Sequence, residues 1–419
     1  MLRKLNLWYG NEIIGELSHE KVNTPIHGFS NTMEIITFKY TPVWINNPEA
    51  FALSPYFPLL DRTFYGDTVW NFFENIIPEG QSINAINRHL QNRRLDLFGF
   101  LTHFGSDVPC AFQILPENSK PQYTGEIQEF SFEELEKYTG PLLLFSKRKS
   151  LSLAGCQNKM GIVIKDNKFF IPLDSAPTTH IIKAYDETNH KNSAFNEFLM
   201  TKLARKLGFD VPDVDYYNKY FIIKRYDREN NQRLHQIDLC QYFNRPSEEK
   251  YEEFKGYPSD EKGLTINHYF EALSQLKNDE DELAKWISFN FLIGNTDNHG
   301  KNISLLYKNN KWQLAPFYDF VCTTIYNYFE LPYNVNGETN IAVIKGDDFL
   351  QMSEENNYDP NKFVCIFNEV KERLLNSFEE VLKENHVKHD KFINSLITEF
   401  KEIGENINLK PLSSSPSPC

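Results

Sequence analysis

The sequence predicts an α+β fold in which a β-rich N-terminal region precedes a mostly helical C-terminal region. Short apolar runs flanked by turn pairs are concentrated before residue 228, and helical periodicity dominates after it. Hydrophobic residues make up 41% and charged residues 24% of the 419 residues, which is the composition of an ordinary globular protein. At about 100 to 200 residues per domain, this length favours two or three structural units.

The first unit, residues 1–140, is predicted to be a small α/β subdomain. Residues 1 to about 45 have the pattern of strands, with Gly10-Asn11 as a tight turn between two of them. Residues 68–90 change to helical spacing, and Pro78-Glu79-Gly80 divides them into two helices.

The second unit, residues 141–228, has the element order of a small nucleotide-binding lobe. We first expect a hairpin of strands 161–164 and 169–172 across Asp166-Asn167, and then a strand 179–183 that ends on Lys183. A helix follows, from an N-cap at Ser193 to Gly208. A second hairpin of strands 214–217 and 220–224 turns across Asn218-Lys219. This order alone also fits other α+β folds.

The third unit, residues 229–410, is predicted to be mostly helical. Residues 283–292 form its most apolar helix, and Asn309-Asn310 marks a hairpin of strands 302–307 and 312–314. Residues 411–419 are rich in Ser and Pro, which predicts a disordered tail.

Charge and cysteine content narrow the functional class. The formal net charge is −13, and such a field repels nucleic-acid phosphates and anionic membrane surfaces, so free-standing DNA binding is disfavoured. The six cysteines are scattered without a C-x-x-C pair, which favours reduced thiols over a zinc site. No signal sequence or membrane span is indicated, and we therefore expect a cytoplasmic protein.

The most informative motif is Asn295-Thr296-Asp297-Asn298-His299-Gly300-Lys301-Asn302, which is followed by Asp319-Phe320. Phosphoryl transfer from ATP needs one carboxylate near the acceptor hydroxyl, and a second carboxylate plus an amide oxygen for Mg²⁺. Asn302 lies five residues after Asp297, which is the spacing of the kinase catalytic loop, and Asp319-Phe320 follows a predicted hairpin as the metal-binding D-F-G of kinases does.

The motif departs from the common eukaryotic pattern in two places. No His-Arg pair precedes Asp297, and Val321 stands where D-F-G has glycine. Because Asn and Asp are common in turns, residues 297–300 are also compatible with a plain helix-to-strand connection.

Upstream residues could supply a cation for phosphate. Kinases use a strand lysine that is oriented by a helical glutamate, and Lys183 followed by Glu197 fits that order. Taken singly, Lys183 is also compatible with a solvated strand end, and Glu197 with an ordinary acid in the first turn of a helix.

These motifs, taken together, resemble the HipA-type serine/threonine kinases, the toxins of bacterial toxin–antitoxin modules. The resemblance is carried by Ser152-Leu153-Ala154-Gly155-Cys156-Gln157-Asn158-Lys159, residues 178–183, Asn196-Glu197, Arg225-Tyr226-Asp227-Arg228, residues 295–302 and Pro316-Phe317-Tyr318-Asp319. Residues 71–80 also resemble the HipA N-terminal subdomain. The resemblance implies a protein-kinase-like two-lobed fold with an all-helical C-terminal lobe.

The resemblance also implies a role for each site residue. Asp297 would be the catalytic base, Asn302 and Asp319 the Mg²⁺ ligands, and Lys183 the cation on the ATP phosphates. The other nucleotide contacts that it implies are Gly155, Gln157 and Lys159 in the phosphate loop, Lys224, Arg225 and Tyr226 at the adenine hinge, and His299. By its position alone, His299 also fits a loop histidine that contacts only backbone.

In this family the serine of the phosphate loop is an autophosphorylation site whose modification ejects the loop. Ser150 and Ser152 both occur here, and which of them is modified stays open. A phosphoserine adds about −1.5 to −2 charge, so it would be repelled from ATP phosphates, and Lys147-Arg148-Lys149 could bind it elsewhere. That basic triplet also fits a solvated loop, because runs of charged residues are usually solvent-facing.

Two functions from different classes follow. The first is a protein kinase whose targets, by the family resemblance, are aminoacyl-tRNA synthetases of the glutamyl or tryptophanyl type, and whose partner is a small HipB-like DNA-binding antitoxin. The alternative is a catalytically silent kinase fold that binds a nucleotide or an antitoxin. Asp297, Asn302 and Asp319 are all present, which favours the active enzyme.

Overall fold

The structure, a computed structural model, describes residues 2–26, 29–90, 95–145, 157–173, 176–185, 188, 190–252, 263–276 and 279–410. The chain divides into two compact units that are built from alternating segments and are described one at a time. Unit 1 comprises Met1–Ala184, Ile222–Ser247 and Leu305–Gln313, and unit 2 comprises Tyr185–Phe221, Glu248–Ser304 and Leu314–Cys419. The domain limits expected from the sequence stay a prediction.

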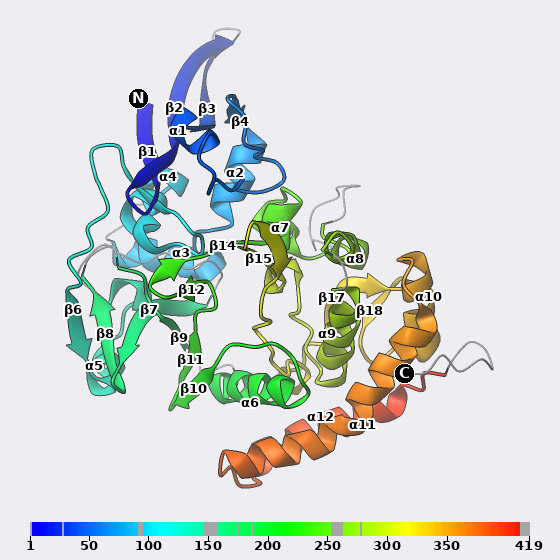
Figure 1. Ribbon diagram of the computed structural model, residues 1–419. Helices are drawn as coiled ribbons and strands as arrows, with labels where there is room; N and C mark the ends of the chain where they lie inside the picture. The colour runs from blue at the N-terminus through cyan, green and yellow to red at the C-terminus, as the bar shows by residue number, and fades with distance from the viewer. Residues whose placement is uncertain are drawn as a thin grey trace. The chain divides into compact units, whose positions relative to one another are not determined.

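Unit 1 begins with an antiparallel sheet of order β4-β3-β2-β1-β5. Figure 1 labels its strands β1 to β4. Its strands are β1 (Leu2–Tyr9), β2 (Glu12–Ile26), β3 (Phe29–Tyr40), β4 (Thr63–Tyr65) and β5 (Gln113–Pro116). The register pairs Leu5 with Leu17 and Leu17 with Phe38, and all three side chains are buried. Because side chains alternate between the two faces of a strand, this row defines the core face of the sheet.

Aromatic rings pack against this core face. Phe38 lies 5.7 Å from the ring of Phe57 and 6.0 Å from that of Phe73, measured between centroids. Gly15 is required on the neighbouring strand, because a Cβ there would come within 2.4 Å of the Phe38 ring. The helices of unit 1 are α1 (Pro42–Ile45), α2 (Asp67–Glu74), α3 (Gly80–His89), α4 (Leu97–Phe104), α5 (Phe132–Lys137) and α7 (Leu239–Tyr242). The predicted break at Pro78-Glu79-Gly80, between α2 and α3, is confirmed.

The part of the second sheet that belongs to unit 1 has the order β11-β9-β7-β8-β6. Its strands are β6 (Ile127–Phe130), β7 (Asn158–Lys165), β8 (Lys168–Pro172), β9 (His180–Ala184) and β11 (Tyr220–Lys224). Asp166 and Asn167 have φ angles of 51° and 58°, as a two-residue hairpin between β7 and β8 requires. The hairpin predicted at these two residues is therefore confirmed.

A third sheet of unit 1 follows the order β14-β15-β16, with β14 (His235–Asp238), β15 (Ser304–Lys308) and β16 (Lys311–Leu314). His235 stacks on Phe51 with 4.6 Å between ring centroids and lies 5.4 Å from Trp312. Burial lowers the pKa of His235 to about 4, so its ring is uncharged at neutral pH and packs as an aromatic side chain. A short hairpin, β12 (Arg228–Glu229) and β13 (Gln232–Arg233), precedes this sheet.

Unit 2 is mostly helical (Figure 1). Its helices are α6 (Ser193–Lys206), α8 (Ile266–Ser274), α9 (Glu280–Leu292), α10 (Gly346–Glu355), α11 (Pro360–Glu384) and α12 (Lys391–Asn406), and β10 (Val214–Tyr217) joins β11 through a turn at Asn218. Helix α9 is buried along most of its length and packs against α11. Phe363, Phe367, Val370 and Leu374 recur at helical spacing along the buried face of α11.

The predicted α+β class is confirmed, and two details differ from expectation. The C-terminal region is not all-helical, because β17 (Glu330–Val335) and β18 (Glu338–Asn340) form a hairpin across Asn336 and Gly337, whose φ angles are positive. The N-cap of α6 is Asn192 instead of Ser193. Among the described residues, no helix combines the length and the hydropathy needed to cross a membrane.

Candidate active site

The loop after α9 carries Asp297 and Asn302 within unit 2. Gly294 begins this loop with a φ of +67°, and a Cβ on it would lie 2.3 Å from the Thr324 hydroxyl oxygen, so glycine is required there. The loop ends in a single 3-10 turn, Gly300–Asn302, directly before β15. Both predicted site residues therefore lie on a short connection between two buried elements.

The side-chain amide of Asn295 holds this loop together. Its nitrogen donates to the side-chain oxygen of Asn290 on α9 at 2.6 Å and to the carbonyl of Asp319 at 3.3 Å. Its oxygen accepts the backbone N–H of Asp297 at 3.1 Å, and the Asn302 amide nitrogen donates to the Asp297 carbonyl at 2.8 Å. The structure thus brings together the three residues that the sequence predicted for phosphoryl transfer, namely Asp297, Asn302 and Asp319.

The Asp297 carboxylate lies at the surface of unit 2, with 60% of its side chain exposed. Its Oδ1 accepts a hydrogen bond from the Tyr251 hydroxyl at 3.0 Å and lies 4.0 Å from Nε2 of His299. In contrast, Asn295 and Asn302 are buried. The carboxylate is therefore accessible to a second reactant, while the amides that support it are shielded from water.

The segment around Asp319 is fixed from both sides. Asp319 adopts a left-handed φ of +61°, and the next residue, Phe320, is fully buried with its ring 5.1 Å from that of Phe289 on α9. Asn196 on α6 binds Cys322 through both of its side-chain atoms, donating to the carbonyl at 2.9 Å and accepting the N–H at 3.0 Å. These anchors place Asp319 beside the Asp297 loop without the glycine of D-F-G.

Lys183 lies in unit 1, on β9, directly opposite Lys159 on β7. The neighbouring pair, Met160 and Ile182, is fully buried on the other face of the same strands. Both lysines therefore project from one face of the sheet. Glu197, which the sequence pairs with Lys183, lies in unit 2 and accepts a hydrogen bond from the Tyr185 hydroxyl, so the predicted Lys183–Glu197 ion pair stays a prediction.

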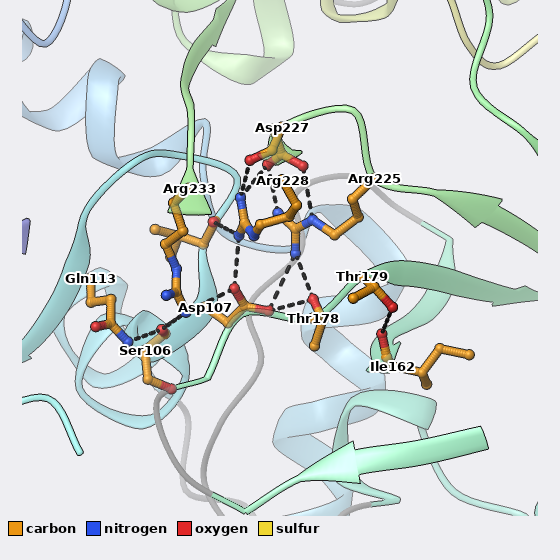
Figure 2. A network of polar contacts seen from close by, with 11 residues as sticks. Ser106, Asp107, Gln113, Ile162, Thr178, Thr179, Arg225, Asp227, Arg228 and Arg233 are labelled. Atoms are coloured by element: carbon orange, nitrogen blue, oxygen red, sulfur yellow. Dashed lines mark hydrogen bonds and ion pairs between the residues drawn. The ribbon is translucent and has the colours of Figure 1, made fainter. Parts of the chain in front are cut away.

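The predicted hinge residues lie at the end of β11, and Arg225 is part of a buried ionic network (Figure 2). Arg225 binds both carboxylate oxygens of Asp227, at 2.9 and 2.7 Å, and approaches Asp107 at 3.3 Å. Its side chain is 99% buried, so it faces the interior of unit 1 and not an open surface. Lys224 is exposed, and the Tyr226 hydroxyl donates to the side chain of Gln236.

Asp107 is the centre of this network. Its carboxylate binds Arg228 at 2.7 Å and Arg233 at 3.2 Å, and it accepts the Thr178 hydroxyl at 2.6 Å. Burial alone would raise the pKa of Asp107, but Arg228, Arg225 and Arg233 hold it well below its usual range. Asp107 lies in the turn after α4, and the network links it to residues that flank β9 and β11. The network therefore fixes the ends of these two strands, of which β9 carries Lys183 and β11 leads into the predicted hinge.

Of the remaining predicted site residues, two lie within the described part of the chain and three lie outside it. The Gln157 carbonyl accepts a hydrogen bond from the Ser82 hydroxyl at 3.2 Å, and His299 is buried beside Asp297. Ser150, Ser152 and Gly155 lie outside the described residues. In the part of the chain that the structure describes, no three His, Cys, Asp or Glu side chains gather around a possible metal position.

Sequence reasoning missed three residues that shape the site. Asp107 and Tyr251 are isolated in the sequence and carry no local signal of their contacts. Asn196 precedes Glu197 in a motif, but only the fold reveals its paired bonds to Cys322. Each of these contacts joins residues at least 46 positions apart, which no local pattern encodes.

Unit 1 thus contains a sheet with two lysines on one face. Unit 2 is mostly helical and brings together the two loops that carry Asp297 and Asp319. Residues 5–115 match the HipA N-terminal domain family, and residues 151–378 match the HipA-like C-terminal domain family. The second match covers more than half of the chain, so the chain belongs to the HipA family. The family resemblance drawn from the motifs is confirmed.

Individual relatives agree with this assignment. The serine/threonine-protein kinase toxin HipA of Shewanella oneidensis is 28% identical over 348 residues, which are 78% of this chain and 76% of that protein. The protein Y4mE of Sinorhizobium fredii is 29% identical over 348 residues, 78% of each chain. A solved complex of Shewanella oneidensis HipA, HipB and operator DNA contains a chain of the same fold, with a TM-score of 0.78, 22% identity and 96% of both chains covered.

Replacing Asp107 with Asn should destabilise unit 1 strongly. The substitution keeps the shape of the side chain but removes the buried negative charge that Arg225, Arg228 and Arg233 share. Breaking a buried ionic group in this way costs about 3 to 5 kcal/mol, so the free energy of unfolding measured in urea should fall by that order.

Asp61→Asn is the matched control. Asp61 pairs with Lys39 at 3.0 Å, but its side chain is 66% exposed, and exposed pairs contribute about 0 to 1 kcal/mol. Equal changes in unfolding free energy for the two variants would show that the Asp107 network does not stabilise unit 1.

Proposed function

We propose that this protein is an ATP- and Mg²⁺-dependent serine/threonine protein kinase of the HipA toxin type. The observation that carries the proposal is the hydrogen-bonded grouping of Asp297, Asn302 and Asp319 in unit 2. Family membership supports it, because a relative that is 28% identical over 348 residues is named a serine/threonine-protein kinase toxin.

The donor atoms fit Mg²⁺. The Asn302 nitrogen is used by the Asp297 carbonyl, so the amide oxygen is the atom that remains for a cation, and Asp319 adds a carboxylate. Mg²⁺ prefers such oxygen ligands and commonly completes its shell with water and phosphate oxygens. When bound, the ion would neutralise charge on the phosphates during transfer.

Asp297 would act as the base in this reaction. The serine oxygen of the target forms a bond to the γ-phosphorus, the bond from that phosphorus to the β,γ-bridging oxygen breaks, and ADP leaves with that electron pair. The serine proton passes to the Asp297 carboxylate, whose exposure suits an acceptor that must meet a protein substrate. Lys183 and Lys159 would hold the phosphates, and Gln157, Gly155, Lys224 and Tyr226 would complete the nucleotide contacts. The buried Arg225 side chain, which the sequence also placed among these contacts, instead supports the hinge from inside unit 1.

The proposed target is a cytosolic translation protein, an aminoacyl-tRNA synthetase of the glutamyl or tryptophanyl type. The proposed partner is a HipB-like DNA-binding antitoxin, since a protein of this fold was solved with HipB and operator DNA. With a net charge of −13, the chain would reach DNA only through such a partner. Operator binding by the purified chain alone, in a gel shift at physiological salt, would contradict this division of roles.

A silent kinase fold that binds only a nucleotide or an antitoxin is the alternative. It would not need the acidic site, whereas Asp297, Asn302 and Asp319 are retained and lie together. This grouping favours the active enzyme.

Asp297→Asn should slow phosphoryl transfer strongly. Incubation with γ-labelled ATP and Mg²⁺ should label the wild-type chain and one of the purified synthetases, and removal of the base should lower the rate by about 100-fold or more. The exposed Asp215→Asn, on β10, is the control and should keep the wild-type rate. If folded wild-type protein labels neither itself nor a synthetase, only the silent fold remains.

Ser152→Ala should remove most autophosphorylation, and Ser150→Ala in parallel distinguishes the two candidate serines. Modification of this loop would add negative charge next to the ATP phosphates, which disfavours nucleotide binding. Intact-mass spectrometry after incubation with ATP measures the outcome. Full phosphate incorporation in Ser152→Ala would exclude Ser152 as the site.

A further inference from the structure

The Tyr251 hydroxyl makes a direct side-chain contact with the Asp297 carboxylate. It donates to Oδ1 at 3.0 Å, and the tyrosine ring meets the His299 ring edge-on, with 5.2 Å between centroids and 83° between planes. Lys250 lies over the same ring at 5.4 Å. Tyr251 thus touches both the proposed base and the histidine beside it.

Tyr251 sits on a segment that is firmly attached to β17 and to the loop itself. Its neighbour Glu252 donates its N–H to the Pro332 carbonyl at 2.7 Å and accepts the Asn334 N–H on its carboxylate at 2.6 Å. Leu264, which bonds back to Glu249 at 2.9 Å, packs so tightly against Gly300 that a Cβ there would lie 2.4 Å away. The tyrosine is therefore held at a fixed place beside the Asp297 loop.

The contact makes the two carboxylate oxygens of Asp297 different from each other. Tyr251 and His299 both approach Oδ1, and within the described residues Oδ2 has no hydrogen-bond or ion-pair partner. Because the Asp297 side chain is 60% exposed, it would sample several rotamers without such a bond. A donor on Oδ1 restricts the side chain and leaves Oδ2 for the proton of an acceptor hydroxyl.

We propose that Tyr251 is the positioning residue for the base: it fixes Asp297 through Oδ1 so that Oδ2 takes the serine proton. The inference rests on the proposed kinase function and adds a residue to that site. Tyr251 does not touch the nucleotide in this scheme, so its hydroxyl affects the rate of transfer and not the affinity for ATP.

Tyr251→Phe tests this role, because it removes only the hydroxyl. The initial rate of self-phosphorylation is measured by intact mass over a range of Mg·ATP concentrations, with binding of a non-hydrolysable ATP analogue and the thermal midpoint measured in parallel. We expect the maximal rate to fall about tenfold, with the half-saturating ATP concentration, the analogue affinity and the thermal midpoint unchanged.

Tyr358→Phe is the matched control. Its hydroxyl also donates to an aspartate, Oδ1 of Asp281 at 2.9 Å, but on a different part of unit 2. We expect this variant to keep the wild-type rate. An unchanged or higher rate for Tyr251→Phe overturns the positioning role. So does a fall in rate that Tyr358→Phe shows as well, or one that is accompanied by a lower thermal midpoint. Absence of any labelling in the wild type overturns the proposed kinase function itself.

Discussion

The buried side chain of Asn295 is the constraint on which the acidic site depends. One amide group binds the end of α9, the carbonyl of Asp319 and the N–H of Asp297, and so sets the distance between two loops that are 24 residues apart in the chain. Such an amide must satisfy its donors and acceptors when it is removed from water, and here the loops that carry Asp297 and Asp319 provide partners. The same hydrogen bonds therefore satisfy the buried Asn295 amide and bring the Asp297 and Asp319 loops together.

Charge is handled differently in the two units. Unit 1 buries three arginines around Asp107 and Asp227, and this network fixes the chain near Thr178 and Arg225, next to β9 and β11. Unit 2 instead leaves the Asp297 carboxylate accessible on a buried amide frame. A paired, dry network suits a part that has to stay rigid, whereas an accessible carboxylate suits a part that exchanges a proton with another molecule.

Local sequence signals predicted the parts of the fold that local physics decides. The hairpins at Asp166-Asn167 and Asn309-Asn310 followed from residues that tolerate positive φ, and the hairpin at Asn336-Gly337 carries the same signal but was overlooked. The acidic residues were predicted from their type and spacing. The contacts of Asp107 and Tyr251 could not be predicted from the sequence, because they join segments 118 and 46 residues apart and depend on the packed fold.

The most direct measurement of the central claim is a crystal structure with Mn²⁺ in place of Mg²⁺ and a non-hydrolysable ATP analogue, in which anomalous scattering locates the metal. We expect the metal to bind the Asn302 amide oxygen and the Asp319 carboxylate, with the terminal phosphate facing Asp297. Nucleotide bound elsewhere, or a metal that contacts neither side chain, would contradict the claim that these residues form a phosphoryl-transfer site.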